Sequence, residues 1–208
     1  MDVYEAIARR QTIRDFAARP VPAEIVHKLL DAGLKAPSND HLRRWEFVLV
    51  QERARREELV RQISAPRTPE GARQVVDEWG LTDPLQREMY IQGIARQYAM
   101  ILNAGCLIVP CFYYPGDLLR PDSLSALNGL ASIWCCVENI LVAAAAEGIF
   151  GVVRIPFEEE RAFMKRFLCL PEHYEIPCSI ALGYPAENAS RARQVEIRLE
   201  DRLHQEQW

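Results

Sequence analysis

Lysine is scarce in this chain of 208 residues, because 22 of its 25 basic residues are arginine. The sequence also lacks a CxxC pair, a histidine at zinc-ligand spacing from a cysteine, and a GxGxxG motif. These absences argue against a zinc centre and against a dinucleotide-binding βαβ unit. A net charge of −4 and a pI near 5.7 disfavour a nucleic-acid partner, which would need a strongly basic face.

Long hydrophobic runs are missing as well. The longest apolar segment, residues 133–146, carries Glu138 and Asn139 in its middle and falls short of the roughly 20 residues that a membrane-spanning helix needs. We therefore expect a buried helix there and no membrane partner. The first residues are charged from Asp2 onward and do not form a secretory signal. A cytoplasmic protein is expected, with its six cysteines reduced and mostly in the core.

Apolar periodicity predicts an α+β or α/β layered fold in one domain, residues 1–208, with two small domains as the alternative. Helices are expected over residues 2–10, 22–35, 53–64, 87–103, 123–147 and 157–168. Strands are expected over residues 45–51, 104–114, 151–155 and 178–182. Pro110 inside the second of these strands indicates a bulge or an edge position.

Two segments depart from this pattern. Residues 65–86 are interrupted by prolines and glycines, and we expect a lid or an insertion there. Residues 186–208 are polar and have no core pattern. They form either a frayed terminus or a tail that wraps around a partner subunit.

A basic motif follows the first expected helix. Arg10, Thr12 and Arg14 alternate in chain that should be extended, so their side chains should converge on one face. Two guanidinium groups and a hydroxyl suit a phosphate monoester or a ribityl-like polyol. The alternative is a solvated basic turn, or a site for a different phosphate ligand.

Two further motifs are polar or glycine-marked turns. Residues 36–45 place Pro37, Ser38 and Asn39 between a helix and a strand, where binding groups commonly lie, although a plain polar turn has the same composition. Residues 146–154 contain Gly148 and Gly151 after the expected buried helix, as a helix C-cap would.

In their order and spacing, these motifs resemble the nitroreductase-like FMN flavoprotein family over most of the chain. That family has a helix ending in Arg-x-Ser/Thr-x-Arg/Lys before a Phe, then a helix ending in Ala-Pro-Ser before a Trp and a strand. It continues with a buried helix leading into a Gly-Leu-Gly-like turn and with a last strand ending in Gly-Tyr-Pro. The matching residues are Arg10, Thr12, Arg14, Phe16, Ala36, Pro37, Ser38, Trp45, Gly148, Gly151, Gly183, Tyr184 and Pro185.

The resemblance implies a mixed central sheet flanked by helices, in a domain-swapped homodimer that holds two FMN molecules between its chains. It implies cofactor contacts from Arg10, Gln11, Thr12, Arg14, Pro37, Ser38, Asn39, His41, Val153, Arg154, Arg191 and Arg193. The loop at 37–41 would approach the flavin of the partner subunit, and the backbone at 153–154 would line the ring. Arg14 would tune the flavin electrostatically, with no catalytic side chain needed.

The implied activity is hydride transfer from NADH or NADPH through the flavin to a nitroaromatic, quinone or similar small acceptor, in a ping-pong cycle. Arg43 stands where many members carry a neutral amide, so it is an expected substrate contact. Trp79, in the segment that would close as a lid, is the other. One alternative is a flavin-dependent reductive dehalogenase or dehydrogenase, with residues 65–86 closing as its lid. The other is a non-catalytic flavin-binding or ligand-binding protein in which Arg43 and a closed lid block the nicotinamide.

Overall fold

The computed structural model describes residues 1–208, and its centre is a five-stranded sheet. The strands β1 (Trp45–Leu49), β2 (Cys106–Tyr113), β5 (Ser179–Gly183) and β3 (Phe150–Arg154) lie side by side in that order, and β4 (Tyr174–Glu175) pairs with the end of β2. Every ladder is antiparallel, with Val48 opposite Val109 and Ile108 opposite Ile180. The α+β class is confirmed, and parallel pairing is confined to one bridge between Thr12 and Gly151.

The expected edge position of Pro110 is wrong, because β2 lies inside the sheet. Pairing of β2 with β5 ends at Ile108, and pairing with β4 begins at Phe112. Pro110 therefore lies in the gap between these two partners, while β1 pairs along its other side. A proline that donates no hydrogen bond is tolerated where one neighbour is missing.

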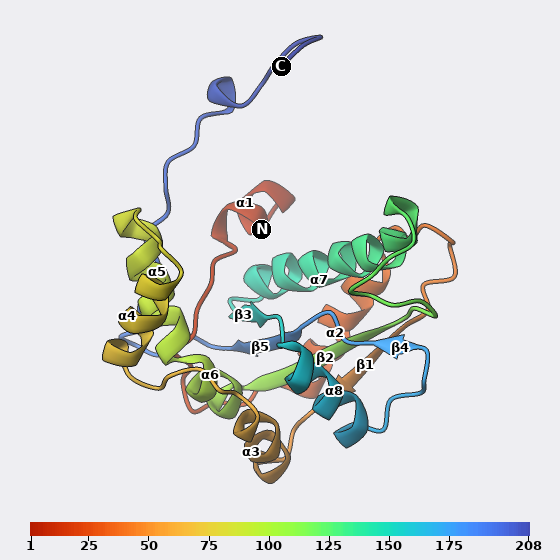
Figure 1. Cartoon of the computed structure of the whole chain (residues 1–208), viewed down its shortest axis with the longest axis horizontal. Coiled ribbons are helices and arrows are strands. Elements are labelled where there is room, and N and C mark those ends of the chain that lie inside the picture. Colours follow the sequence, from red (N-terminus) through yellow and green to blue (C-terminus); the bar gives the residue numbers. More distant parts are fainter.

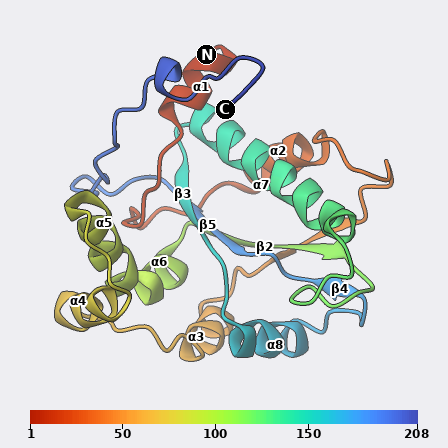
Figure 2. The ribbon, with the colours of Figure 1, turned by 45° about the horizontal axis from the view of Figure 1, so that its top comes forward.

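Helices cover both faces of the sheet (Figures 1 and 2). On one face lie α1 (Val3–Arg9), α2 (Ala23–Leu34) and α7 (Asn128–Ala146). On the other lie α3 (Arg53–Arg61), α6 (Gln97–Asn103) and α8 (Glu158–Phe167). A 3₁₀ turn at Leu124–Leu127 precedes α7. Strand β2 alternates between two cores, since Ile108 packs in the core with α2 and α7 while Leu107 and Val109 pack in the core with α3, α6 and α8. Burial on both faces explains why β2 is apolar throughout.

Length and composition alone would allow the helical stretch Leu124–Ala146 to cross a membrane. In the fold, one face of α7 carries Ile133, Val137 and Ile140, which are at most 1% exposed and pack in the core with α2 and the sheet. This is the environment of a core helix. The opposite stripe of α7, with Ala131, Cys135 and Glu138 at helical spacing, is exposed.

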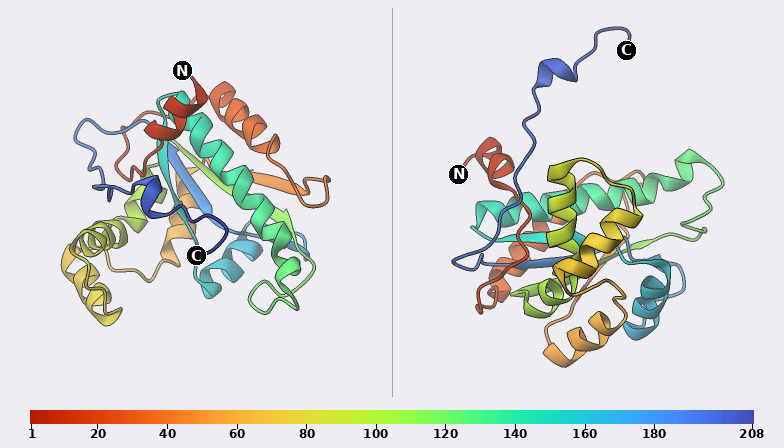
Figure 3. Two further views of the ribbon diagram at one scale, coloured as in Figure 1. Left: turned by 90° about the horizontal axis from the view of Figure 1, so that it is seen from above. Right: turned by 60° about the vertical axis from the view of Figure 1, so that its left-hand side comes forward.

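The segment expected as a lid or insertion contains regular helix. Helices α4 (Pro69–Glu78) and α5 (Pro84–Ala95) pack against each other around Ala72, Val76 and Ile94, beside the sheet rather than over it (Figure 3). The single helix expected over residues 87–103 is therefore wrong: α5 begins at Pro84, and the chain bends at Arg96 before α6 begins.

The C-terminal segment leaves the body of the molecule (Figures 1 and 3). Beyond Arg193 every residue is exposed, and the only helical turn is Leu199–Asp201. Its side chains Val195, Ile197 and Leu199 are 61–69% exposed although they are apolar. The chain itself supplies nothing for this apolar segment to pack on.

Candidate active site

The extended chain after α1 is fixed against the sheet by a short parallel contact. Ile13 is fully buried, and its backbone N–H donates to the Gly151 carbonyl at 3.1 Å. Thr12 bridges to Gly151, and Phe16 bridges to Pro185. With Ile13 facing the core, the side chains on either side of it face the opposite way. The predicted convergence of Arg10, Thr12 and Arg14 follows from this geometry.

A pocket of about 190 Å³ lies between this segment and β3. Its lining residues are Arg10, Gln11, Thr12, Arg14, Leu141, Phe150, Gly151, Val152 and Val153. Gly151 is required here, because a Cβ at this position would lie 2.2 Å from the Ala181 carbonyl oxygen of the neighbouring strand. The backbone of β3 can therefore form one wall of the pocket without a side chain at its base.

Arg14 carries the least compensated charge in this pocket. Its guanidinium makes no ion pair. Burial and the nearby positive charge of Arg96 lower its pKa, and the negative charge of Asp15, which pairs with Arg96, partly opposes this shift. It lies against Gly93 of α5, where an added Cβ would come within 3.2 Å of Nη2. By contrast, Arg10 pairs with Glu138 of α7 at 3.4 Å, and both side chains are partly exposed. Arg14 thus faces the pocket as an unpaired cation.

The C-terminal segment adds one of its two predicted arginines to this region. Arg191 lines a neighbouring cavity together with Arg9, Arg10 and Gln11, whereas Arg193 is exposed and lies outside that lining. Ser190 anchors the start of the segment by donating from Oγ to Gln92 Oε1 of α5 at 2.9 Å. The basic cluster therefore draws on both ends of the chain.

The loop after α2 is tied to the beginning of α7. The backbone N–H of Asn39 donates to Ser132 Oγ at 3.1 Å, and that hydroxyl donates to the Asn128 carbonyl at 2.7 Å. His41 and Arg43 adopt positive φ angles of 58° and 44°, a region that non-glycine residues seldom occupy. The loop is thus held in a strained conformation from both ends.

The Arg43 side chain hydrogen-bonds to the backbone of this loop. Its Nε donates to the Ala36 carbonyl at 3.0 Å, and Nη1 donates to the His41 carbonyl at 3.4 Å. Asp40 adds a second tie by accepting from the Leu42 N–H at 3.1 Å, a hydrogen bond that lowers the pKa of the carboxyl. The exposed guanidinium of Arg43 therefore shapes the loop as well as contributing charge.

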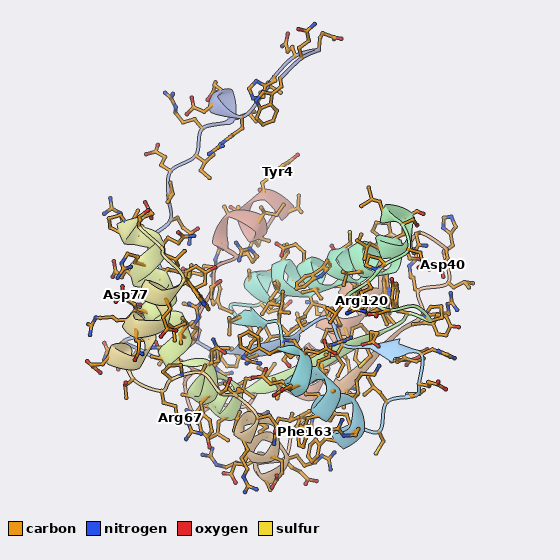
Figure 4. All side chains as sticks on the ribbon, viewed as in Figure 1. Tyr4, Asp40, Arg67, Asp77, Arg120 and Phe163 are labelled. Carbon is orange, nitrogen blue, oxygen red and sulfur yellow. The ribbon has the colours of Figure 1, made fainter.

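The loop and the basic pocket lie at opposite ends of α7 within one chain. Asn39 contacts Ser132, whereas the pocket includes Leu141, nine residues later, which corresponds to about 14 Å along the helix axis. Figure 4 shows Asp40 beside one end of α7 and Tyr4 of α1 above the other. None of Pro37, Ser38, Asn39 or His41 lines the pocket that holds Arg14.

Two other predicted site residues are placed away from the pocket. Val153 lines it, but Arg154 does not: its side chain is buried and is engaged by Glu160 at 2.7 Å and by Gln97 at 2.7 Å. Trp79 ends α4 and packs edge-on against Tyr90, with half of its surface exposed and no contact to the pocket.

Sequence reasoning missed several pocket residues. Leu141, Phe150 and Val152 line the pocket but are not among the predicted site residues, and neither are Gly93 and Glu138, which lie beside Arg14 and Arg10. Only Phe150 and Val152 carried a signal, as part of the glycine-marked turn. The others reach the site through the packing of α5 and α7, which no local pattern reveals.

Comparison with known proteins gives a consistent result. A family model described as the nitroreductase family matches residues 7–184. A protein of Methanothermobacter thermautotrophicus named as an NADH dehydrogenase/NAD(P)H nitroreductase is 32% identical, over all of this chain and 88% of that protein. A crystal structure of a protein from Bacteroides thetaiotaomicron, named in the same way, superposes with a TM-score of 0.70 at 22% identity and covers 99% of this chain and 98% of its own.

A structure of oxidised iodotyrosine deiodinase bound to FMN and 3-iodo-L-tyrosine is also similar. It has a TM-score of 0.72 at 16% identity, over 95% of this chain and 97% of its own. At this identity the similarity concerns the fold. The family model and the archaeal relative extend from the basic segment to the Gly-Tyr-Pro end of the last strand, and they confirm the resemblance that the motifs indicated: this chain belongs to the nitroreductase family of oxidoreductases.

Proposed function

We propose that this protein is an FMN-dependent oxidoreductase that takes its electrons from NADH or NADPH. The observation that carries the proposal is the unpaired Arg14 guanidinium in the pocket between residues 10–14 and β3. A half-buried cation without an ion pair is costly unless a ligand supplies the missing charge or hydrogen bonds. The donor set fits FMN, because guanidinium groups, an amide and a hydroxyl suit its phosphate, its ribityl chain and the carbonyl edge of its ring.

In this arrangement, bound FMN would supply hydride exchange between a nicotinamide and a second substrate. The residues of the chain hold and tune it. Arg14 would hold a fixed positive charge near the pyrimidine edge of bound FMN, where reduction adds negative charge. Arg10, with Arg191 and Arg193 of the tail, would bind the phosphate once Glu138 releases Arg10. The backbone of β3 at Val153 and Arg154 would lie along the ring.

We propose that two copies of the chain complete each site in a domain-swapped homodimer. The pocket of one chain, about 190 Å³, is smaller than the roughly 300–1,000 Å³ of typical small-ligand pockets. The loop with Pro37, Ser38, Asn39 and His41 lies at the far end of α7, so it serves the partner's site. Pairing across the exposed stripe of α7 would also give the apolar side chains of the C-terminal segment a surface to cover.

The acceptor that fits best is a small, flat, unsaturated molecule such as a nitroaromatic or a quinone, in a ping-pong cycle. Oxidised nicotinamide would leave before the acceptor binds, and initial-rate plots should then be parallel. Arg43 beside the partner's site would favour acceptors with an acidic group. Reductive dehalogenation is the second candidate, since iodotyrosine deiodinase shares the fold. Turnover of a halogenated tyrosine under reducing conditions, with nitroaromatics inert, would favour it.

The decisive test is the flavin itself. The purified protein should be yellow and release FMN on denaturation, and Arg14→Met should raise the Kd for FMN about tenfold or more, because a charge-assisted hydrogen bond is lost. Arg73→Met on the outer face of α4 is the matched control and should leave the Kd unchanged. A colourless protein that takes up no added FMN, or equal affinity in both variants, would refute the proposal.

A further inference from the structure

A second and larger pocket lies on the α3 and α6 side of the sheet, apart from the FMN site. It has a volume of about 500 Å³, and residues 16–20, the start of α3 and the end of α6 surround it. Three arginines line it, namely Arg19, Arg53 and Arg56, together with the amides of Gln51 and Asn103. No aspartate or glutamate is among its lining residues. The pocket is therefore positively charged.

Arg56 is the central charge of this pocket. Its side chain is nine-tenths buried, with Nε donating to the Val50 carbonyl at 2.7 Å and Nη1 donating to the Ala104 carbonyl. No carboxylate pairs with it. Burial lowers its pKa, Cys106 partly opposes this shift, and the charge of Arg53 adds to it. Its Nη2 makes no hydrogen bond within the protein. Every side-chain nitrogen or oxygen that is fully buried has a hydrogen-bond partner, so Nη2 must be accessible. Nη2 is thus open to the pocket as a free donor.

The beginning of α3 adds a second attraction for an anion. Glu52 occupies the N-cap position without a capping hydrogen bond from its side chain, and the first turn contains no acidic residue. Instead, that turn carries Arg53, Arg55 and Arg56, the opposite of what the helix dipole favours. The first backbone N–H groups of a helix have no partner within it. An anion at this end would satisfy these donors and compensate the arginines.

Arg19 completes the pocket from the other side. Its guanidinium carbon lies 3.9 Å from the centroid of the Tyr184 ring, and this stacking orients the side chain. Arg19 makes no ion pair, so its charge is not neutralised by a carboxylate. The chain beneath it is tightly fixed, because a Cβ at Gly105 would lie 2.8 Å from the Arg19 carbonyl oxygen. Arg53 is held by Glu57 at 3.2 Å, and both of these side chains are exposed enough to rearrange.

We propose that this pocket binds a phosphate group, either as the free ion or as a phosphate monoester. Guanidinium forks, free helix N–H groups and neutral amides recognise a phosphate dianion together. The volume exceeds what a bare ion needs and falls within the range of small-ligand pockets, so a nucleoside monophosphate also fits the available space. The pocket uses residues 16–20, directly after the FMN-binding segment, and shares no side chain with the FMN site.

The test uses inorganic phosphate on the FMN-saturated protein, by calorimetry, with sodium chloride at equal ionic strength as the reference. Phosphate should bind saturably, and Arg53→Gln and Arg19→Gln should each weaken binding about tenfold. Arg61→Gln is the matched control, because Arg61 lies on the same helix, is as exposed as Arg53 and pairs with one glutamate. Arg56 is left intact, since removing it would strand two buried carbonyl groups.

Flavin fluorescence recorded alongside shows whether phosphate displaces FMN. Tighter binding of AMP than of phosphate, lost in the same variants, would identify a monoester as the ligand, and equal affinity would identify the free ion. The proposal fails if phosphate binds no better than chloride, if Arg53→Gln and Arg19→Gln bind like Arg61→Gln, or if binding releases FMN. Failure of this proposal is distinguishable from failure of the FMN proposal, because Arg19 and Arg53 do not line the FMN pocket and the calorimetry can be repeated on protein without added FMN.

Discussion

Gly93 positions Arg14 without touching the proposed cofactor. An alanine in α5 would normally stabilise the helix by about 1 kcal/mol relative to glycine. Here its Cβ would come within 3.2–3.3 Å of the Arg14 guanidinium and displace it by a few tenths of an ångström. We expect Gly93→Ala to keep or raise the melting temperature while weakening FMN binding about threefold to tenfold, as measured by fluorescence titration.

A double-mutant cycle tests that route. In an Arg14→Met background, Gly93→Ala should have no further effect on FMN binding, because the displaced group is gone. An equal loss of affinity in both backgrounds would show that Gly93 acts through something other than Arg14.

Arg43 stabilises the conformation of the loop, and we expect it to contribute little to the affinity for the cofactor. Replacing it with alanine frees the Ala36 and His41 carbonyls and relaxes a segment held at positive φ. Because this loop lies far from Arg14 in the same chain, Arg43→Ala should keep the Kd for FMN within about twofold and lower kcat/KM for the acceptor about tenfold. Arg73→Ala is the control in the same assays. Loss of FMN from Arg43→Ala would contradict this division of roles.

The sequence predicted which residues of one segment come together, while their roles toward a cofactor stay predictions. Alternation in extended chain was enough to bring Arg10, Thr12 and Arg14 together, because Ile13 must point into the core. For Arg154 the sequence predicted only a backbone contact, and it gave no sign that the side chain pairs with Glu160 of α8. Side-chain direction at a strand end depends on such long-range partners.

At the scale of elements, the buried ion pair between Arg154 and Glu160 joins β3 to α8. Both side chains are less than a tenth exposed, and Glu160 also accepts the backbone N–H of Phe157 at 3.1 Å. Glu160→Gln leaves Arg154 as an uncompensated buried charge and should lower the free energy of unfolding by about 3 kcal/mol. Urea denaturation at pH 7 measures this. The neighbouring exposed Glu159→Gln should change it by less than about 0.5 kcal/mol.

The helices of the 65–86 segment show why prolines misled the prediction. Thr68 and Asp83 each accept a hydrogen bond from a backbone N–H of the first turn, and Pro69 and Pro84 follow them at the first helical position. A proline there starts a helix, because its missing N–H would have had no partner anyway. The capping signal was therefore present in the sequence. By contrast, β4 has two residues and exists only because β2 offers it an edge.

At the scale of the whole molecule, the reaction of each cysteine with a thiol reagent shows whether its surface is exposed to solvent or buried in the fold or an interface. Cys106, Cys111, Cys136 and Cys178 are buried, and burial raises the pKa of Cys106 to about 11 and those of Cys111 and Cys136 to about 12. Their thiolates would form only as the pH rises toward these values, so none should react at pH 8. Cys135 and Cys169 are exposed in a single chain.

A dimer through α7 would protect Cys135, which lies on the exposed stripe of that helix. We expect one fast-reacting thiol, Cys169, in the native protein at micromolar concentration and six after denaturation, counted with a chromogenic disulfide reagent. Cys169→Ser should remove the fast phase, and Cys135→Ser should leave it unchanged. Two fast thiols in the native protein would mean that α7 is open to solvent and that the interface lies elsewhere.

The C-terminal segment is the part of the chain that most clearly lacks a packing partner within its own subunit. Its apolar side chains Val195, Ile197 and Leu199 alternate along extended chain and have no surface to cover within their own subunit. Ser190 is the last residue whose side chain hydrogen-bonds to the body, through Gln92.

Removing residues 191–208 should therefore leave the melting temperature of the monomer nearly unchanged. It should weaken the dimer at least tenfold, as measured by light scattering, and raise the Kd for FMN through loss of Arg191. The triple substitution of Val195, Ile197 and Leu199 by serine keeps the arginines and should weaken only the dimer. A truncated chain that stays dimeric and fully flavinated would show that the segment is a free terminus, so that the paired α7 helices and the loop at 37–41 alone would have to complete the site.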